Sequence, residues 1–136
     1  MRFSVGYQLP DDDGAETFAD IVADYRDHIE EVYFPWVGQA SGRAKLGVQR
    51  GLRDWTAQRR LEQDLLRLRE MGVKLDILFN SNCYGACAAS EFLENEVGSI
   101  LSHLEDTVGG IDVVTTTSLT IARTVKKYFS DIETQI

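Results

Sequence analysis

The residues best suited to chemistry gather at the end of one apolar run. The segment 75–79 is followed by two amides and two thiols, from Asn80, Asn82, Cys83 and Cys87. Such groups can bind a ligand or react, so this run is typical of a buried strand that delivers polar groups to a site. Asparagine is also a common turn and cap residue. Ligand contact and loop capping are therefore equally good interpretations of Asn80 and Asn82.

The two cysteines stand four residues apart. A helix that begins near Tyr84 would place both thiols on one side of its first turn, where backbone amides favour the thiolate. A metal or iron–sulfur site normally needs about four ligands, and the third cysteine of a radical-SAM pattern is replaced by Ser90. The sequence therefore predicts no cofactor; an iron–sulfur cluster or a divalent metal would need ligands from a missing C-terminal half. A small buried residue is the leading interpretation of Cys87.

Five apolar runs alternate with helical patterns along the chain. Strands are predicted near 2–8, 31–36, 73–80 and 111–117, and a fifth begins at 132–136. Apolar side chains recur at helical spacing in the segments 17–29, 54–71, 88–108 and 120–129. Repeated strand–helix units predict an α/β fold with a parallel sheet in sequential order, right-handed crossovers, and helices on one face.

Two architectures fit this pattern: half of a (β/α)8 TIM-type barrel, and an open doubly wound sheet. A complete barrel takes about 250 residues, and the chain has 136. Residues 1–136 are therefore expected to form a single α/β domain. Because the chain ends inside an apolar run, we expect it to be an N-terminal fragment of a larger barrel.

Polar residues at the predicted strand ends indicate where a ligand would bind. In parallel α/β folds ligands bind at the carboxyl ends of the strands. The predicted ligand-binding residues are Trp36, Arg43, Asn80, Asn82, Cys83 and Thr116. Arg43 could grip a carboxylate or phosphate, or be a solvated loop residue, and β-propensity or N-capping also explains the threonine run around Thr116. Both histidines, His28 and His103, lie in predicted helices, which gives no support for a cysteine–histidine pair, and no catalytic residue is assigned.

Composition excludes several classes of protein. The net charge is −8, with acids and bases interspersed, so the chain lacks a basic surface for nucleic acid. No segment approaches the roughly 18 consecutive apolar residues of a membrane helix. Only two cysteines argue against a disulfide scaffold. A cytoplasmic protein that contacts neither nucleic acid nor membrane is expected.

Three parts of the chain carry strand-end motifs: Tyr33-Phe34-Pro35-Trp36 with Ser41-Gly42-Arg43, then the segment 78–85, and then 112–116. These motifs resemble the N-terminal half of bacterial barrel proteins related to the collagenase-like peptidase family. The resemblance implies a barrel-type fold with a strand-end site in a hydrolase, peptidase-like as a first hypothesis, or in a modification enzyme. The substrate would be a peptide or an unknown small molecule. It assigns no catalytic residue, because residues tied to activity and to iron–sulfur binding lie largely in the later part of that barrel. A non-catalytic binding or assembly module is the alternative.

An arc of four or five strands would leave its inner face and two strand edges uncovered. The predicted inward side chains are mostly apolar: Phe3, Val5, Tyr33, Ile77, Phe79, Val113 and Thr115, or the residues that alternate with them along each strand. Burying such a face against a second copy is the commonest solution. The sequence therefore predicts a homodimer.

Overall fold

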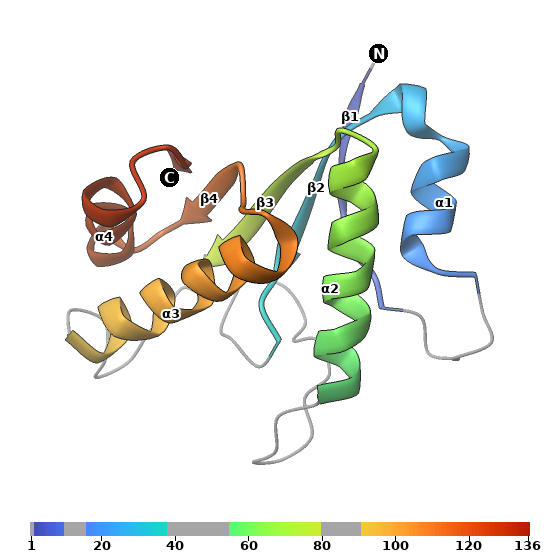
Figure 1. Cartoon of the computed structure of the whole chain (residues 1–136). Coiled ribbons are helices and arrows are strands. Elements are labelled where there is room, and N and C mark those ends of the chain that lie inside the picture. Colours follow the sequence, from blue (N-terminus) through green and yellow to red (C-terminus); the bar gives the residue numbers. More distant parts are fainter. Residues whose placement is uncertain (1, 10–15, 38–54, 80–90) are drawn as a thin grey trace.

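A computed structural model describes residues 2–9, 16–37, 55–79 and 91–136 (Figure 1). The elements are, in order, β1 (Phe3–Gly6), α1 (Phe18–Asp24), the 3-10 helix η1 (Arg26–His28), β2 (Ile29–Pro35), α2 (Trp55–Glu70), β3 (Lys74–Phe79), α3 (Glu91–Val108), β4 (Val113–Thr116), α4 (Leu119–Tyr128) and β5 (Glu133–Gln135). No helix in the described ranges is long and apolar enough to cross a membrane.

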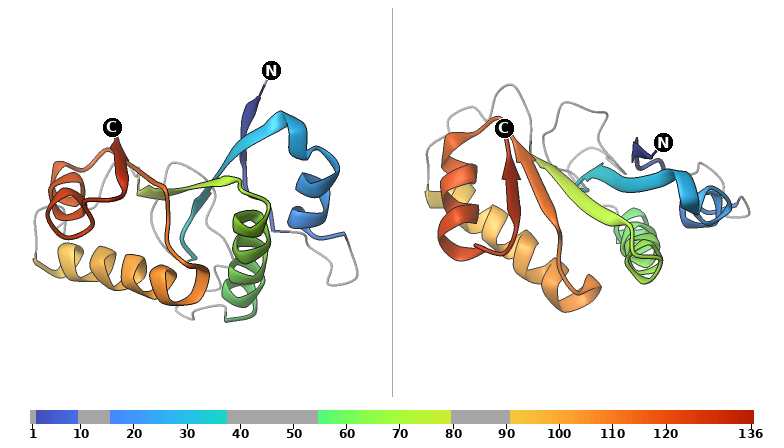
Figure 2. Two further views of the ribbon diagram at one scale, coloured as in Figure 1. Left: turned by 45° about the horizontal axis from the view of Figure 1, so that its top comes forward. Right: turned by 90° about the horizontal axis from the view of Figure 1, so that it is seen from above.

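The five strands form one parallel sheet in the order β1-β2-β3-β4-β5. This confirms the predicted parallel pairing in sequential order. Right-handed crossovers between successive neighbours place every connecting helix on the same side of a sheet, and Figure 2 shows the helices along one side. A doubly wound sheet reverses its strand order at a switch point, and the described strands contain no such reversal.

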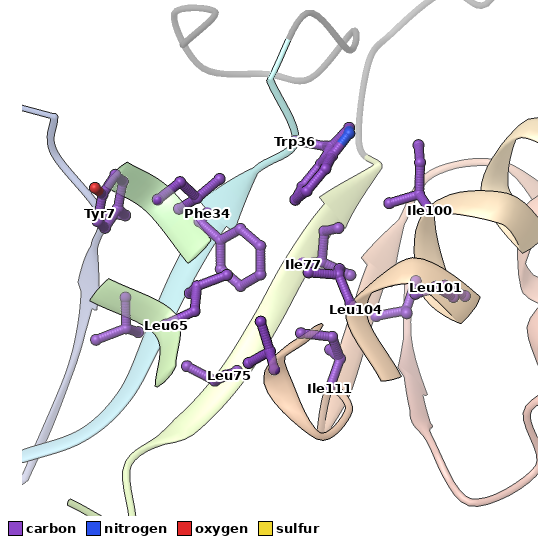
Figure 3. Close-up of a cluster of buried hydrophobic side chains, with 14 of the residues drawn as sticks. Tyr7, Phe34, Trp36, Leu65, Leu75, Ile77, Ile100, Leu101, Leu104 and Ile111 are labelled. Atoms are coloured by element: carbon purple, nitrogen blue, oxygen red, sulfur yellow. The ribbon is translucent and has the colours of Figure 1, made fainter. Parts of the chain in front are cut away.

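The core lies between the sheet and the helices. Phe34 of β2 and Ile77 of β3 are register partners and are fully buried. Leu65 of α2 and Leu104 of α3 belong to the same buried cluster, as Figure 3 shows. Each such side chain contributes about 1.5–3 kcal/mol to folding, so this layer fixes the positions of the strand ends.

Helices α2 and α3 are both followed closely by glycine. Gly72, Gly109 and Gly110 have φ values of 77°, 91° and 108°, a region that a side chain disfavours. The Val73 amide donates to the Leu68 carbonyl at 3.1 Å, which closes the end of α2. The chain can therefore turn directly from each of these helices toward the next strand.

The first helix is shorter than predicted. It begins as the pattern suggests, with Thr17 and Asp20 in a capping box, but it ends at Asp24 instead of continuing to residue 29. Arg26 then donates to the Met71 carbonyl at 2.6 Å and to the Ile29 carbonyl at 3.0 Å. These bonds hold a tight turn, so Ile29 opens β2, and Tyr25 before the turn is 60% exposed.

The side of the sheet without helices is more polar than predicted. We call it the inner face and define it by Glu31, Tyr33, Lys74, Asp76, Leu78, Val113, Thr115 and Glu133, which the register places together. Val5, Ile77 and Phe79, expected there, align instead with the helix-facing core, and Phe3 is 51% exposed. The prediction of an apolar inner face is therefore wrong. Asp76, Ile77 and Leu78 are all buried, so the sequence shows no alternation that would indicate which of them face the helices and which lie on the inner face.

Candidate functional site

All five carboxyl strand ends lie on one edge of the sheet, which we call the carboxyl edge. The segments 10–15, 38–54 and 80–90, which come after β1, β2 and β3 in the sequence, lie outside the described residues. Four predicted ligand-binding residues belong to these segments: Arg43, Asn80, Asn82 and Cys83. Their part in a site stays a prediction.

Thr116 and Trp36 are described, and both are buried. The Thr116 hydroxyl donates to the Phe79 carbonyl at 2.8 Å and accepts from the Ser118 amide at 3.0 Å. It thus joins the ends of β3 and β4, while the Ser118 hydroxyl accepts from Ile121 and caps α4. Thr116 therefore shapes the carboxyl edge through its own bonds, and ligand contact by either residue stays a prediction.

Trp36 joins the carboxyl edge to a polar chain between α2 and α3. Its ring meets that of His103 edge-on, with centroids 6.0 Å apart. His103 Nε2 pairs with the Glu62 carboxylate, which also accepts from Gln58 Nε2 at 3.3 Å. The sequence placed His103 only within a helix, because nothing in its spacing connects it to residue 36.

Asp76 lies at the centre of the inner face. The Thr115 hydroxyl lies 2.9 Å and 2.8 Å from its two carboxylate oxygens, and the residue is 4% exposed. Burial raises the pKa of Asp76 to about 6, the Thr115 bond opposes this rise, and the charges of Glu31 and Glu133 add to it. Carboxyls perturbed in this way cluster at functional sites.

A second buried carboxyl lies on the helix side of the sheet. Tyr7 Oη donates to Asp64 Oδ2 at 2.7 Å, and the Tyr7 ring packs edge-on against Phe18 at 4.9 Å. Burial raises the pKa of Asp64, while the bonds from Tyr7 and the Ala19 amide oppose that rise. Burial and the Asp64 contact also raise the pKa of Tyr7 well above its usual range. The pair joins β1 to α2 as a satisfied polar contact.

Neither Asp64 nor Asp76 was among the site residues predicted from the sequence. An acid inside an apolar strand is a visible signal for Asp76, but its partner Thr115 stands 39 residues away. Tyr7 and Asp64 are 57 residues apart. Within the described ranges, no group of three or more histidine, cysteine or acidic residues could hold a metal ion.

Comparison with known proteins gives one likeness, and it is structural. No protein-family model matches the sequence, and no curated protein matches it. The solved structure of a U32 peptidase matches 98% of this chain with a TM-score of 0.58 and 13% sequence identity. The chain shares the fold of that region. It spans about half of the peptidase, since the match covers 47% of that chain, and at the level of the fold this agrees with the expected distant relation to collagenase-like peptidases.

Proposed function

We propose that this chain is the N-terminal half of a peptidase-like barrel hydrolase and that it binds a peptide at the carboxyl edge. The observation that carries the proposal is the match of almost the whole chain to about half of a U32 peptidase. The sequential parallel sheet supports it, because ligands of barrel folds bind at the carboxyl strand ends. We place the protein in the cytoplasm.

The carboxyl edge suits the binding of a peptide backbone. Side-chain amides of Asn80 and Asn82 would offer both donors and acceptors, and Arg43 would offer a fork for a carboxylate. Cys83 would line the same cleft beside the ends set by Trp36 and Thr116. No catalytic residue is assigned to this half.

A non-catalytic binding or assembly module is the second candidate. One observation favours it. Trp36 and Thr116, the two predicted ligand-binding residues that are described, are both buried, and the Thr116 hydroxyl already donates one hydrogen bond and accepts another. A module of this kind would keep the sheet and the cleft without supporting hydrolysis.

Tryptophan fluorescence offers a direct test of peptide binding. The chain has two tryptophans, so Trp55→Phe leaves Trp36 at the carboxyl edge as the single reporter. We expect gelatin-derived peptides to change its emission in a saturable way. Asn80→Ala/Asn82→Ala should weaken binding about tenfold, the loss of roughly 1.4 kcal/mol of hydrogen bonding.

Glu105→Gln, an exposed change on α3, is the matched control and should leave binding unchanged. Absence of any emission change, or equal binding by the asparagine variant, would contradict the proposal. Peptide cleavage, measured as release of new amino groups, distinguishes the candidates. A binding module would release no new amino groups, even when the chain is completed with the second half of the U32 peptidase fold.

A further inference from the structure

The inner face carries an excess of negative charge. Glu31 lies on β2, Asp76 on the adjacent strand β3, and Glu133 on β5, one strand beyond β4. Lys74 is the single basic residue in the five described strands. Asp76 and Glu133 lie in one lateral row of the sheet, because Val113 is the register partner of both. The charges of Glu31 and Glu133 act unfavourably on Asp76.

Asp76 differs from other acids of the chain in what surrounds it. Asp20 pairs with Arg67 at 2.6 Å, and Asp112 pairs with Arg69 at 3.3 Å. Within the described residues, Asp76 has the Thr115 hydroxyl and no lysine or arginine in an ion pair. A buried carboxylate that lacks a countercharge is costly, so a cation brought to this face would gain more there than at an exposed acid.

We infer that the inner face docks a polypeptide strand that presents lysine or arginine toward Asp76. The occupant is the complementary half of the barrel, and the inference rests on the proposed function. The matched peptidase has about half its length outside the region that this chain matches, and no described helix covers the inner face. Complementary charge selects such a partner and sets its register.

A second copy of this chain fits the face less well. Two inner faces packed together would bring Glu31, Asp76 and Glu133 of one protomer against the same acids of its partner. Like charges placed opposite each other at an interface cost several kcal/mol. The charge on this face therefore opposes the predicted homodimer wherever its contact would use the inner face.

The probe for this docking is a synthetic strand of alternating lysine and valine, about eight residues long, with a glutamate–valine strand as its control. We expect the lysine strand to shift the backbone amide NMR signals of Tyr33, Asp76 and Thr115. Glu31→Gln/Glu133→Gln should weaken its binding at least about fivefold, the effect of removing two surface charges. Added salt should weaken it further.

The matched control is Glu91→Gln/Glu105→Gln, which removes two exposed acids from α3 and should leave binding unchanged. The inference is overturned if both double variants weaken binding equally or if the shifts fall on the helices. The Trp36 signal separates the two proposals. If gelatin peptides bind and the lysine strand does not, the docking on the inner face is contradicted and the edge site is not. If the lysine strand binds and gelatin peptides leave the Trp36 emission unchanged, the edge site is contradicted and the docking is not.

Discussion

The two aspartates that are buried among the described residues lie on opposite sides of one sheet and have opposite surroundings. Asp64, on the helix side, accepts from Tyr7 and from the Ala19 amide, and the charges of Arg60 and Arg67 favour its carboxylate. Asp76, on the inner face, accepts from Thr115 alone among the described contacts, and neighbouring acids oppose its carboxylate. Burial raises the pKa of both.

The two carboxyls differ in whether the described residues stabilise their charged form. The Tyr7–Asp64 bond spans β1 and α2 inside the packed layer, so its role is complete within the chain. Asp76 would gain from a positive charge that the described residues do not supply. This difference is the reason for assigning stability to the helix side and recognition to the inner face.

Tyr7→Phe should have the largest effect on stability. The substitution leaves the buried Asp64 carboxylate without its hydroxyl donor, and we expect the free energy of unfolding to fall by about 2–3 kcal/mol. Denaturant unfolding measures the change. The double variant Tyr7→Phe/Asp64→Leu should recover much of the loss, since replacing both partners removes the unsatisfied group. A single variant as stable as the wild type would show that the pair contributes nothing.

Asp76→Asn should act in the opposite direction, and only at higher pH. The folded-state pKa of about 6 lies above the ordinary aspartate value of 3.8, so the folded protein retains a proton that the unfolded chain releases. The Asp76 contribution to stability therefore falls as pH rises from about 4 to about 6. The full shift corresponds to about 3 kcal/mol.

We expect Asp76→Asn to be more stable than the wild type by about 1–2 kcal/mol at pH 8, because the new amide group lacks an acceptor and offsets part of the gain. At pH 4 the folded chain keeps Asp76 protonated and the cost of the amide group remains, so the variant should be less stable than the wild type by about 1 kcal/mol. Urea unfolding at both pH values gives the difference. A gap that stays constant with pH would show that Asp76 does not titrate in this window.

Thr115→Val should sharpen the difference between the two faces. Removing the hydroxyl takes away the donor that favours the Asp76 carboxylate, so the pKa of Asp76 should rise above about 6. The free energy of unfolding at pH 8 should fall by about 1 kcal/mol. Thr115→Ser keeps the hydroxyl and serves as the control. Equal behaviour of the valine and serine variants would argue that this bond does not matter.

Glu31→Gln/Glu133→Gln should give the smallest effect. Removing two charges that oppose the Asp76 carboxylate lowers its pKa by a few tenths of a unit, the scale of screened surface pairs. At about 1 M salt, where the Debye length is about 3 Å, the difference from the wild type should disappear. Carboxyl-carbon NMR follows both titrations, and a shift that persists at high salt would point to a change in packing.

The sequence predicts where the helices and strands lie better than it predicts which side of the sheet each strand residue faces. Glycines such as Gly72 and Gly109 mark helix ends locally, and the apolar run that became β3 is visible without any partner. The early end of α1 is not visible, because it depends on Arg26 reaching Met71, which is 45 residues away. The register that turns Asp76 toward the inner face likewise depends on pairing with β2 and β4.

The separation of partners along the chain also limits what the sequence could indicate about the site. Clusters such as Asn80 with Cys83 are noticed because they are contiguous, whereas Asp76 with Thr115 and Trp36 with His103 come together only in the folded sheet. Polarity inside a strand is the one local signal that Asp76 gives. Its significance follows from burial and from neighbouring charges, which no spacing rule supplies.

The claim that Asp76 awaits a positive charge is tested most directly by a carboxyl-carbon NMR titration of Asp76, with and without the lysine–valine strand. We predict a midpoint near pH 6 in the free chain. The midpoint should fall toward the ordinary aspartate range when the strand binds, because a nearby cation favours the carboxylate. A midpoint near 3.8 in the free chain, or one that the bound strand leaves unchanged, would contradict it.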